Sequence, residues 1–200
     1  MNVAASSVSR AFSRDLTAVP DRDLVATAVS GIEGSFEELV RRYQRPISAY
    51  VYRMVGNYES ALDLTQEIFI KVYSSLRRYR SEFKFSTWIY KIAHNAAIDH
   101  LRGRRATPAE EVFGADQRAD DSAVDRSHCL HEALAALPDE QRSVVVLRHV
   151  VGLTPGEIAS AMGRSESSIH GLHHRGRRAL QAELTSRDSA PSTAMLAVAA

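Results

Sequence analysis

Apolar residues recur with the period of an α-helix along most of the chain. Between residues 83 and 105 they fall at i, i+3, i+4, i+7 and i+8, which places them on one helix face. These positions are Ile89, Ile92, Ala93, Ala96 and Ala97. The main β-branched run, residues 144–146, lies inside another helical pattern, so strand signals are nearly absent. The sequence therefore predicts an all-α protein.

Breaks in this pattern divide the chain into two small helical domains. Shorter interruptions near residues 31–34, 56–57 and 80–86 separate helices within the first domain. The stretch that joins the domains is acidic, contains Pro108 and Gly114 and shows no sustained period, so we expect a flexible acidic linker. The predicted segments are a flexible N-terminus (1–20), a helical domain (21–105), the linker (106–127), a second helical domain (128–184) and a disordered tail (185–200).

A helix is expected to begin at Tyr58, because Asn57 is a favourable N-cap. One of its faces is predicted to be core, and it carries Tyr58, Leu62, Thr65, Phe69, Val72, Tyr73 and Leu76. Another face carries Asp63, Glu67, Ile70 and Ser74. Two acids beside an exposed isoleucine suit either an ordinary solvated face or a protein-docking face, and the residues alone leave both open.

A second stripe on the 83–105 helix is polar. It carries Trp88, Lys91, Asn95, Asp99 and Arg102. An aromatic ring, two cations, an amide and a carboxylate in one row suit a surface that holds phosphates and stacks on or reads bases. A half-buried packing tryptophan and a solvated basic helix end are the simpler interpretations of the same residues.

The second domain carries the start and stop signals of a helix-turn-helix. Thr154 and Glu157 form a T-x-x-E capping box around Pro155, and Gly163 follows the short helix. Ser165 then caps the next helix after a very short turn. Its predicted inward positions are Ile169, Leu172, Gly176, Ala179 and Leu180, and its outward stripe is Ser167, Gly171, His174 and Arg178, flanked by His170 and Arg175. Small residues followed by arginines suit a helix that lies in a DNA major groove, although a plain helical hairpin has a similar pattern.

Composition narrows the possible functions. The 200 residues carry a net charge of only +1, which excludes a global polycation, but residues 74–105 are strongly basic and residues 106–127 are acidic. The single cysteine, Cys129, allows no internal disulfide, and no secretory signal or membrane-spanning run is present, so a cytoplasmic protein is expected. No nucleotide-binding loop or nucleophile motif is found. The closely spaced His170, His173 and His174 lack a further ligand type nearby, so we expect no metal and no cofactor.

Motifs in series resemble the extracytoplasmic-function group of bacterial sigma-70-type sigma factors. The region-two part resembles FEELVRRY (36–43), DLTQEIF (63–69) and FSTWIYKIAHNAAIDHLR (85–102). The region-four part resembles LPDEQR (137–142), GLTPGEIA (152–159) and the helix over 165–180. The resemblance implies a dissociable initiation factor and not an enzyme. Such a factor binds core RNA polymerase, recognises two promoter elements and traps unpaired bases, whose stacking at about 1–3 kcal/mol each offsets the cost of opening the duplex.

The resemblance also implies partners and residue roles. The partners are the clamp helices of the largest polymerase subunit, the flap of the second-largest subunit, promoter DNA and an anti-sigma factor, without membrane insertion. The implied core-polymerase contacts are Asp63, Gln66, Glu67 and Phe69. The implied minus-ten contacts are Arg80, Phe83, Lys84, Ser86, Thr87, Trp88, Lys91, Asn95, Asp99 and Arg102. The implied minus-thirty-five contacts are Ser165, Ser167, Ser168, His170, Gly171, His174, Arg175 and Arg178.

The chain departs from the family pattern mainly in the second reading helix. Leu172 stands at a usual arginine, His173 at a usual leucine, and Gly176 at a usual alanine, which costs about 1 kcal/mol of helix propensity. A Ser-Ser pair, 167–168, replaces Gly-Thr. Two other functions remain as alternatives: a stand-alone helix-turn-helix regulator that works without polymerase, and a small enzyme that uses the histidine cluster.

Overall fold

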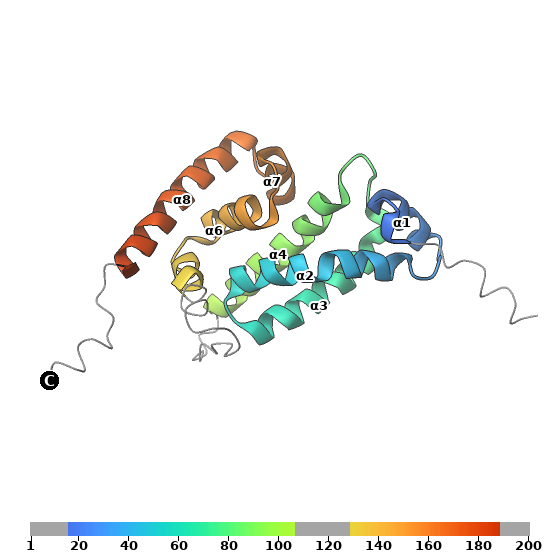
Figure 1. Cartoon of the computed structure of the whole chain (residues 1–200), viewed down its shortest axis with the longest axis horizontal. Coiled ribbons are helices and arrows are strands. Elements are labelled where there is room, and N and C mark those ends of the chain that lie inside the picture. The colour runs from blue at the N-terminus through green and yellow to red at the C-terminus, as the bar shows by residue number, and fades with distance from the viewer. Residues whose placement is uncertain (1–15, 107–128, 189–200) are drawn as a thin grey trace, which may run out of the picture.

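The computed structural model describes residues 16–106 and 129–188, and within these ranges it contains helices and no strand (Figure 1). This confirms the predicted all-α class. The first module contains η1 (Leu16–Ala18), α1 (Asp21–Val29), α2 (Ser35–Val55), α3 (Tyr58–Ser75), η2 (Leu76–Arg78) and α4 (Phe85–Ala106). The second module contains a helical segment over residues 129–135, α6 (Asp139–Val146), the π-helical turn η3 (Leu147–Val151), α7 (Pro155–Met162) and α8 (Glu166–Asp188).

In the first module α2, α3 and α4 pack against one another, and α1 lies across α2 (Figure 1). The turn from α2 to α3 follows from two adjacent residues. Gly56 ends α2 in the left-handed conformation at φ 88°, which glycine adopts without steric cost. Asn57 then caps α3, since its side-chain oxygen accepts a 2.8 Å hydrogen bond from the Ser60 backbone N–H. The predicted break and cap are both confirmed.

A buried carboxylate fixes the N-terminal end of the first module. Glu38, 7% exposed, accepts hydrogen bonds from Arg41 and Arg42, and these bonds lower its pKa from 4.5 to about 2. Arg42 also pairs with Asp21 at 2.7 Å and donates to the carbonyl oxygen of Leu16 at 2.9 Å. Residues 16–20, which were predicted to belong to a flexible N-terminus, are therefore tied to α2.

The second module has the predicted helix-turn-helix geometry. The Thr154 hydroxyl accepts from the Glu157 backbone N–H, and the Glu157 carboxylate accepts from the Thr154 backbone N–H at 2.8 Å, which completes the capping box. Gly163 ends α7 in the left-handed conformation at φ 65°. Ser165 caps α8 by accepting from the Ser168 backbone N–H at 3.3 Å. These local signals are confirmed as predicted.

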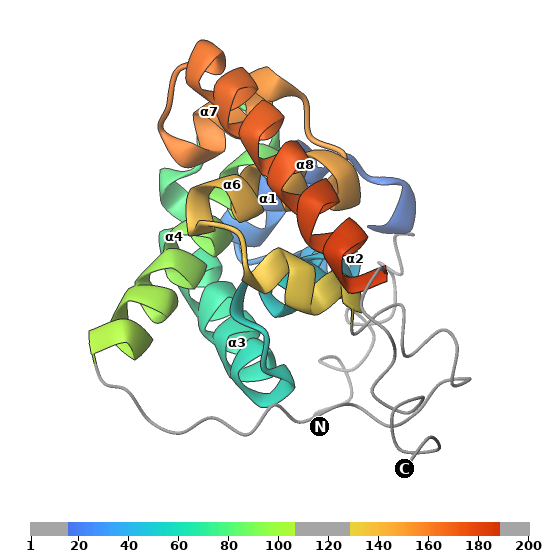
Figure 2. The same cartoon turned by 90° about the vertical axis from the view of Figure 1, so that its left-hand side faces the viewer.

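The two modules pack directly on each other along a surface that we call the seam, where α7 contacts α4 and α6 contacts α2. Figures 1 and 2 show α6 between α8 and the first module. Buried apolar residues form one continuous cluster that runs from the first module through α8. The predicted linker lies outside the described residues, except that α4 continues to Ala106. The prediction of two domains joined by a linker is therefore incomplete, because the two modules are also in direct contact along the seam.

Polar groups hold the centre of the seam. The Ser143 hydroxyl of α6 lies 2.8 Å from His94 Nδ1 of α4 and 3.0 Å from the Tyr50 hydroxyl of α2. All three side chains are at most 7% exposed. Arg142, also buried, donates to the Met54 carbonyl oxygen near the end of α2 at 2.5 Å. Because buried polar groups need partners, these bonds fix how the modules meet.

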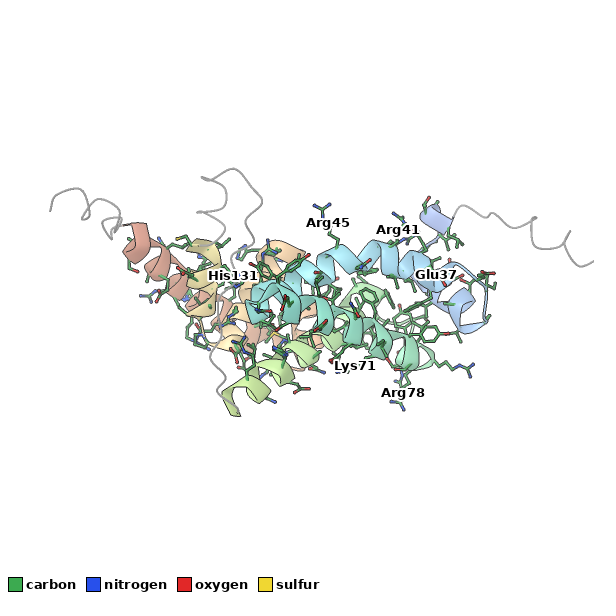
Figure 3. All side chains as sticks on the ribbon, turned by 90° about the horizontal axis from the view of Figure 1, so that it is seen from below. Glu37, Arg41, Arg45, Lys71, Arg78 and His131 are labelled. Carbon is green, nitrogen blue, oxygen red and sulfur yellow. The ribbon has the colours of Figure 1, made fainter. Side chains whose placement is uncertain are left out.

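A stacked pair of rings extends the seam. Figure 3 shows His131 beside the C-terminal end of α2, and its ring stacks on Tyr52 with centroids 4.8 Å apart. At the far C-terminus α8 continues to Asp188, so residues 185–188 of the predicted disordered tail are helical. The rest of that tail and residues 1–15 lie outside the described residues. No helix of the described part is long and apolar enough to cross a membrane.

Candidate nucleic-acid interface

The outward surface of α4, which we call the α4 face, presents Lys91, Asn95, Asp99 and Arg102, all of them exposed. Arg102 and Asp99 lie 4.0 Å apart, and both side chains are 74% exposed. A cavity of about 710 Å³ separates part of this face from the second module, whose Glu140 and Arg164 line the opposite wall. The structure therefore confirms one continuous polar stripe and places it beside the seam.

Trp88 occupies an aromatic cluster at the start of α4. Its ring lies 5.5 Å from Tyr79 and 5.6 Å from Phe85, measured between centroids, and it is half-buried. α4 begins at Phe85, so Ser86 and Thr87 lie within its first turn. Thr87 is only 6% exposed and faces the core, so it does not belong to the exposed surface. Trp88 is thus held rigidly with only part of its ring available to a partner.

The loop before α4 carries further exposed groups next to the start of that helix. Phe83 is 54% exposed, and its carbonyl oxygen accepts a 2.6 Å hydrogen bond from the Tyr79 hydroxyl. Lys84 pairs with Glu157 of α7 at 2.8 Å. That bond and the Thr154 backbone bond lower the pKa of Glu157. Arg80 is exposed. The loop residues predicted to contact DNA therefore gather beside Trp88, but one of them is engaged by the second module.

The surface of α3 differs from the prediction in one respect. Ala61, Leu64, Thr65, Ile68 and Val72 form its buried face. Tyr58 and Tyr73, which were predicted to be core, are 49% and 63% exposed, and Leu62 is 39% exposed. The core face is rotated because α2 and α4 meet the small and branched residues of α3, while its aromatic residues lie at the edge.

This rotation widens the outward surface, which we call the α3 face. It carries Asp63, Gln66, Glu67 and Ile70, all exposed, and Ile70 reaches 68%. Phe69 is half-buried and packs on the core. Lys71, visible on this side in Figure 3, lies 3.9 Å from Glu67. An acidic surface with an exposed isoleucine suits a protein partner that carries cations around an apolar groove.

The outward stripe of α8, which we call the α8 face, is accessible. Its exposed residues are Ser167, His170, His174, Arg175 and Arg178. Gly171 and Ser168 are half-buried, and Ser165 is exposed as the cap. The predicted inward residues Ile169 and Leu172 are 1% and 7% exposed. Cations and imidazoles along one side of a helix that is anchored on the other give the charge and shape required to lie in a DNA groove.

Two departures from the expected family pattern have structural explanations. At Gly176, α8 approaches α6 so closely that an added Cβ would lie 2.9 Å from Val145 Cγ2 and 3.1 Å from the Gln141 carbonyl oxygen. Glycine is therefore required by packing at this crossing. Leu172, where an arginine is usual, is buried in the common core. The inward side of α8 is specialised for packing in this chain.

Sequence reasoning missed the residues that work across long sequence separations. His94, Ser143 and the Lys84–Glu157 pair hold the seam, and no local signal connects them. Ser143 stands directly before three valines, and a polar residue at the edge of an apolar run could have suggested a buried hydrogen bond. His149 was also missed; it contacts His173 across the second module. Among the described residues, no group of three or more His, Cys, Asp or Glu side chains is arranged to hold a metal ion.

Comparisons with known families agree with this architecture. Residues 39–107 match the family described as Sigma-70 region 2, and residues 127–180 match Sigma-70, region 4. The chain is similar to the RNA polymerase sigma-H factor of Pseudomonas aeruginosa, with 31% identity over 185 residues, 84% of this chain and 96% of that protein. It is also similar to the ECF RNA polymerase sigma factor SigW of Bacillus subtilis, with 29% identity over 170 residues, 77% of this chain and 91% of that protein.

Solved structures share the fold. CnrH, in complex with the cytosolic domain of CnrY, superimposes with a TM-score of 0.67 at 25% identity, over 83% of this chain and 97% of that one. The sigma factor RpoE from Bartonella quintana, in complex with the anti-sigma factor NepR, gives a TM-score of 0.66 at 18% identity, over 75% of this chain and 96% of that one. The second likeness supports the fold alone, since its sequence identity is low.

Proposed function

This chain belongs to the sigma-70 family and is a sigma factor of its extracytoplasmic-function group, and from that premise we propose a division of labour among its three surfaces. The α3 face docks on core RNA polymerase, the α4 face opens and reads the minus-ten element, and the α8 face reads the minus-thirty-five element. The observation that carries this proposal is that three exposed surfaces of distinct chemistry lie on a single chain. A stand-alone helix-turn-helix regulator needs only the last of them.

Docking on the polymerase is assigned to Asp63, Gln66 and Glu67. Phe69 packs on the core and so holds this part of α3 in place. The exposed carboxylates of Asp63 and Glu67 complement a basic partner surface, while the exposed Ile70 offers an apolar contact beside them. We assign this contact to the clamp helices of the largest subunit. The second module then reaches the flap of the second-largest subunit.

Strand opening is assigned to the α4 face and the loop before it. Phe83 and the exposed part of Trp88 offer aromatic surface for unpaired bases, at about 1–3 kcal/mol for each base that stacks. Arg80 in the loop and Lys91 and Arg102 along α4 are exposed cations that would hold phosphates. Thr87 is not assigned a direct contact, because it is buried.

Duplex reading is assigned to α8, whose anchored inner side leaves the outer side free for the groove. Gly171 and the serines near its start permit close approach to base edges, and Arg175 and Arg178 reach phosphate or guanine. The two promoter elements are named for positions about 25 base pairs apart, which is about 85 Å of B-form DNA at about 3.4 Å per pair. We propose that the two modules, which are in contact along the seam, separate to reach both elements when the factor engages polymerase and promoter. Opening also releases Lys84 from Glu157.

An anti-sigma factor is the proposed regulatory partner, as the family resemblance implies; CnrH, at 25% identity, was likewise solved with another protein bound, the cytosolic domain of CnrY. It would act in the cytoplasm, where polymerase and chromosome are found. Recovery of the endogenous protein from cells without any bound regulator would contradict this part of the proposal.

The central test is run-off transcription with core polymerase on promoters mapped by transcript sequencing after overexpression. The Asp63→Ala/Glu67→Ala variant should lose core binding and promoter-dependent transcripts. Glu37→Ala, which removes an exposed acid from α2, is the matched control and should retain both. Wild-type protein that gives no initiation above core polymerase alone would overturn the proposal, and full activity of the double variant would remove the α3 assignment.

A further inference from the structure

Two histidines meet at the edge of the α8 face. His149 of η3 and His173 of α8 meet edge to edge, with their Nε2 atoms 2.8 Å apart, their ring centroids 5.0 Å apart and an interplanar angle of 29°. His149 is exposed and His173 is half-buried. Neither residue belongs to the surfaces assigned above.

The contact between two ring nitrogens constrains their protons. One Nε2 must donate and the other must accept, so a neutral pair needs different tautomers on its two rings. A single added proton preserves the contact, because a cationic ring still donates to a neutral one. A second proton would place two N–H groups and two positive charges face to face. The pair therefore holds at most one added proton while it stays in contact.

The surroundings of the pair oppose even that proton in the free protein. Burial first, and then the positive charges nearby, lower the pKa of His173. The charged neighbours are Arg148 of η3 and Arg177 of α8, and His170 lies one turn before His173. Arg148 is held in place by donating to the Leu153 carbonyl oxygen at 2.9 Å.

The remaining elements around the pair supply no counter-charge. A cleft of about 240 Å³ beside His173 is lined by apolar residues of α6 and α7 together with Arg148 and His170. Glu166 of α8 places its Oε1 3.9 Å from His170 Nε2, and no carboxylate is among the groups that shift the pKa of His173. The local field is therefore positive and lacks the anion that would stabilise a protonated pair.

A DNA backbone would supply that anion. On a helix, residues three and four apart lie on the same side, so His170, His173 and Arg177 form a row next to the outward stripe of α8. The edge of a groove-binding helix is where backbone phosphates lie. We propose that His149 and His173 form a proton-linked contact for a DNA backbone phosphate, so that binding of duplex DNA by the second module takes up a proton. This inference rests on the proposed role of α8.

The sign of the effect follows from linkage. A phosphate stabilises the protonated pair, so protonation and DNA binding favour each other by the same factor. Affinity for duplex DNA should therefore rise as the pH falls, by at most about tenfold per pH unit for one proton. We expect a gain of about five- to twentyfold between about pH 8 and pH 6. The slope of log affinity against log salt should also steepen by about 0.9 at the lower pH, which corresponds to one more neutralised phosphate.

The experiment measures anisotropy of a short labelled duplex with the full chain, over a salt series at both pH values. His149→Gln/His173→Gln should bind as wild type does at the higher pH and lose the gain at the lower pH. His149→Arg places a fixed cation in the same position and should bind at the higher pH as tightly as wild type binds at the lower one. His100→Gln, a histidine of α4, is the matched control and should keep the wild-type pH dependence.

Two outcomes overturn the inference: a wild-type affinity that does not change with pH, or a pH dependence that the double glutamine variant retains. Circular dichroism of each variant establishes that it is folded. Arg178→Gln separates this inference from the proposed function, because loss of that exposed cation should weaken DNA binding equally at both pH values. If Arg178→Gln has no effect at either pH, the role of α8 in DNA binding fails. If it weakens binding while wild type shows no proton linkage, only the histidine inference fails.

Discussion

Replacement of Gly176 by alanine tests whether α8 and α6 are as closely packed as the structure indicates. Gly176 is buried, and a Cβ there would lie 2.9 Å from Val145 Cγ2, 3.1 Å from the Gln141 carbonyl oxygen and 3.2 Å from Gln141 Cβ. Two of these neighbours belong to the rigid part of α6. The extra methyl group can therefore be accommodated only if the two helices move apart.

Two opposing effects decide the free energy of unfolding of Gly176→Ala. Alanine gains about 1 kcal/mol of helix propensity over glycine. Overpacking of a well-packed contact costs about 1–3 kcal/mol. The net expectation is a loss of about 0–2 kcal/mol. Gly103→Ala is the matched control, because Gly103 is also helical but an added Cβ would meet nothing within 4 Å. That variant should gain about 0.5–1 kcal/mol.

Urea and thermal denaturation of the two variants measure the difference. For a chain of this size, 1 kcal/mol corresponds to about 2–4 °C in Tm, so the two variants should differ by several degrees in opposite directions. A Val145→Ala background should reduce the cost of Gly176→Ala, because it removes the nearest atom, and the double-mutant cycle would report that coupling. The reasoning is refuted if Gly176→Ala stabilises the protein as much as Gly103→Ala does.

Three further results are expected. Glu38→Gln should destabilise the protein near neutral pH and have little effect at low pH. The pKa of Glu38 is about 2 in the folded state against the ordinary 4.5, so its contribution to stability is complete above about pH 4.5 and is lost as the pH falls toward 2. Urea midpoints measured across that range check this prediction, and a destabilisation that does not change with pH would contradict it. Ser143→Ala should lower the free energy of unfolding by about 1–3 kcal/mol, because it leaves the buried His94 without its closest partner. Urea denaturation measures this loss, and an unchanged free energy of unfolding would show that the seam contributes nothing. Trp88→Ala should leave binding to core RNA polymerase intact in a pull-down assay. It should reduce run-off transcripts from linear templates by about tenfold or more, as the loss of one stacking contact of about 1–3 kcal/mol implies. Equal loss of both activities would show that the substitution acts on folding instead.

Local signals made much of the fold predictable from the sequence. The caps at Asn57, Thr154 and Ser165 depend on residues within three positions of one another, so each could be located by inspection. The polar stripe of α4 followed equally well from the helical period, because α4 is long and its inner face is mostly apolar. The helix-turn-helix was predictable for the same reason.

Long-range packing was not predictable in this way. The face of α3 that is buried depends on which residues of α2 and α4 it meets, and this turned Tyr58 and Tyr73 outward against expectation. Lys84 was assigned to DNA through the family resemblance, and nothing in the loop sequence indicates that it pairs with Glu157, far along the chain. The sequence alone shows only that Gly176 lowers the helix propensity of α8, because the close approach of α6 that favours glycine at this position depends on the tertiary packing.

The buried Arg142 has a consequence for experiments that divide this protein. The last carbonyl groups of any helix lack partners within the helix, and here Arg142 of α6 donates to one of them, the Met54 carbonyl oxygen of α2. A fragment cut between residues 107 and 128 would remove the donor from one piece and leave a guanidinium without that acceptor on the other. DNA affinities measured on separate halves would thus include the effect of exposing seam surfaces that the free intact protein buries. Full-length protein, with seam substitutions in place of truncations, is the appropriate material for dissecting its two modules.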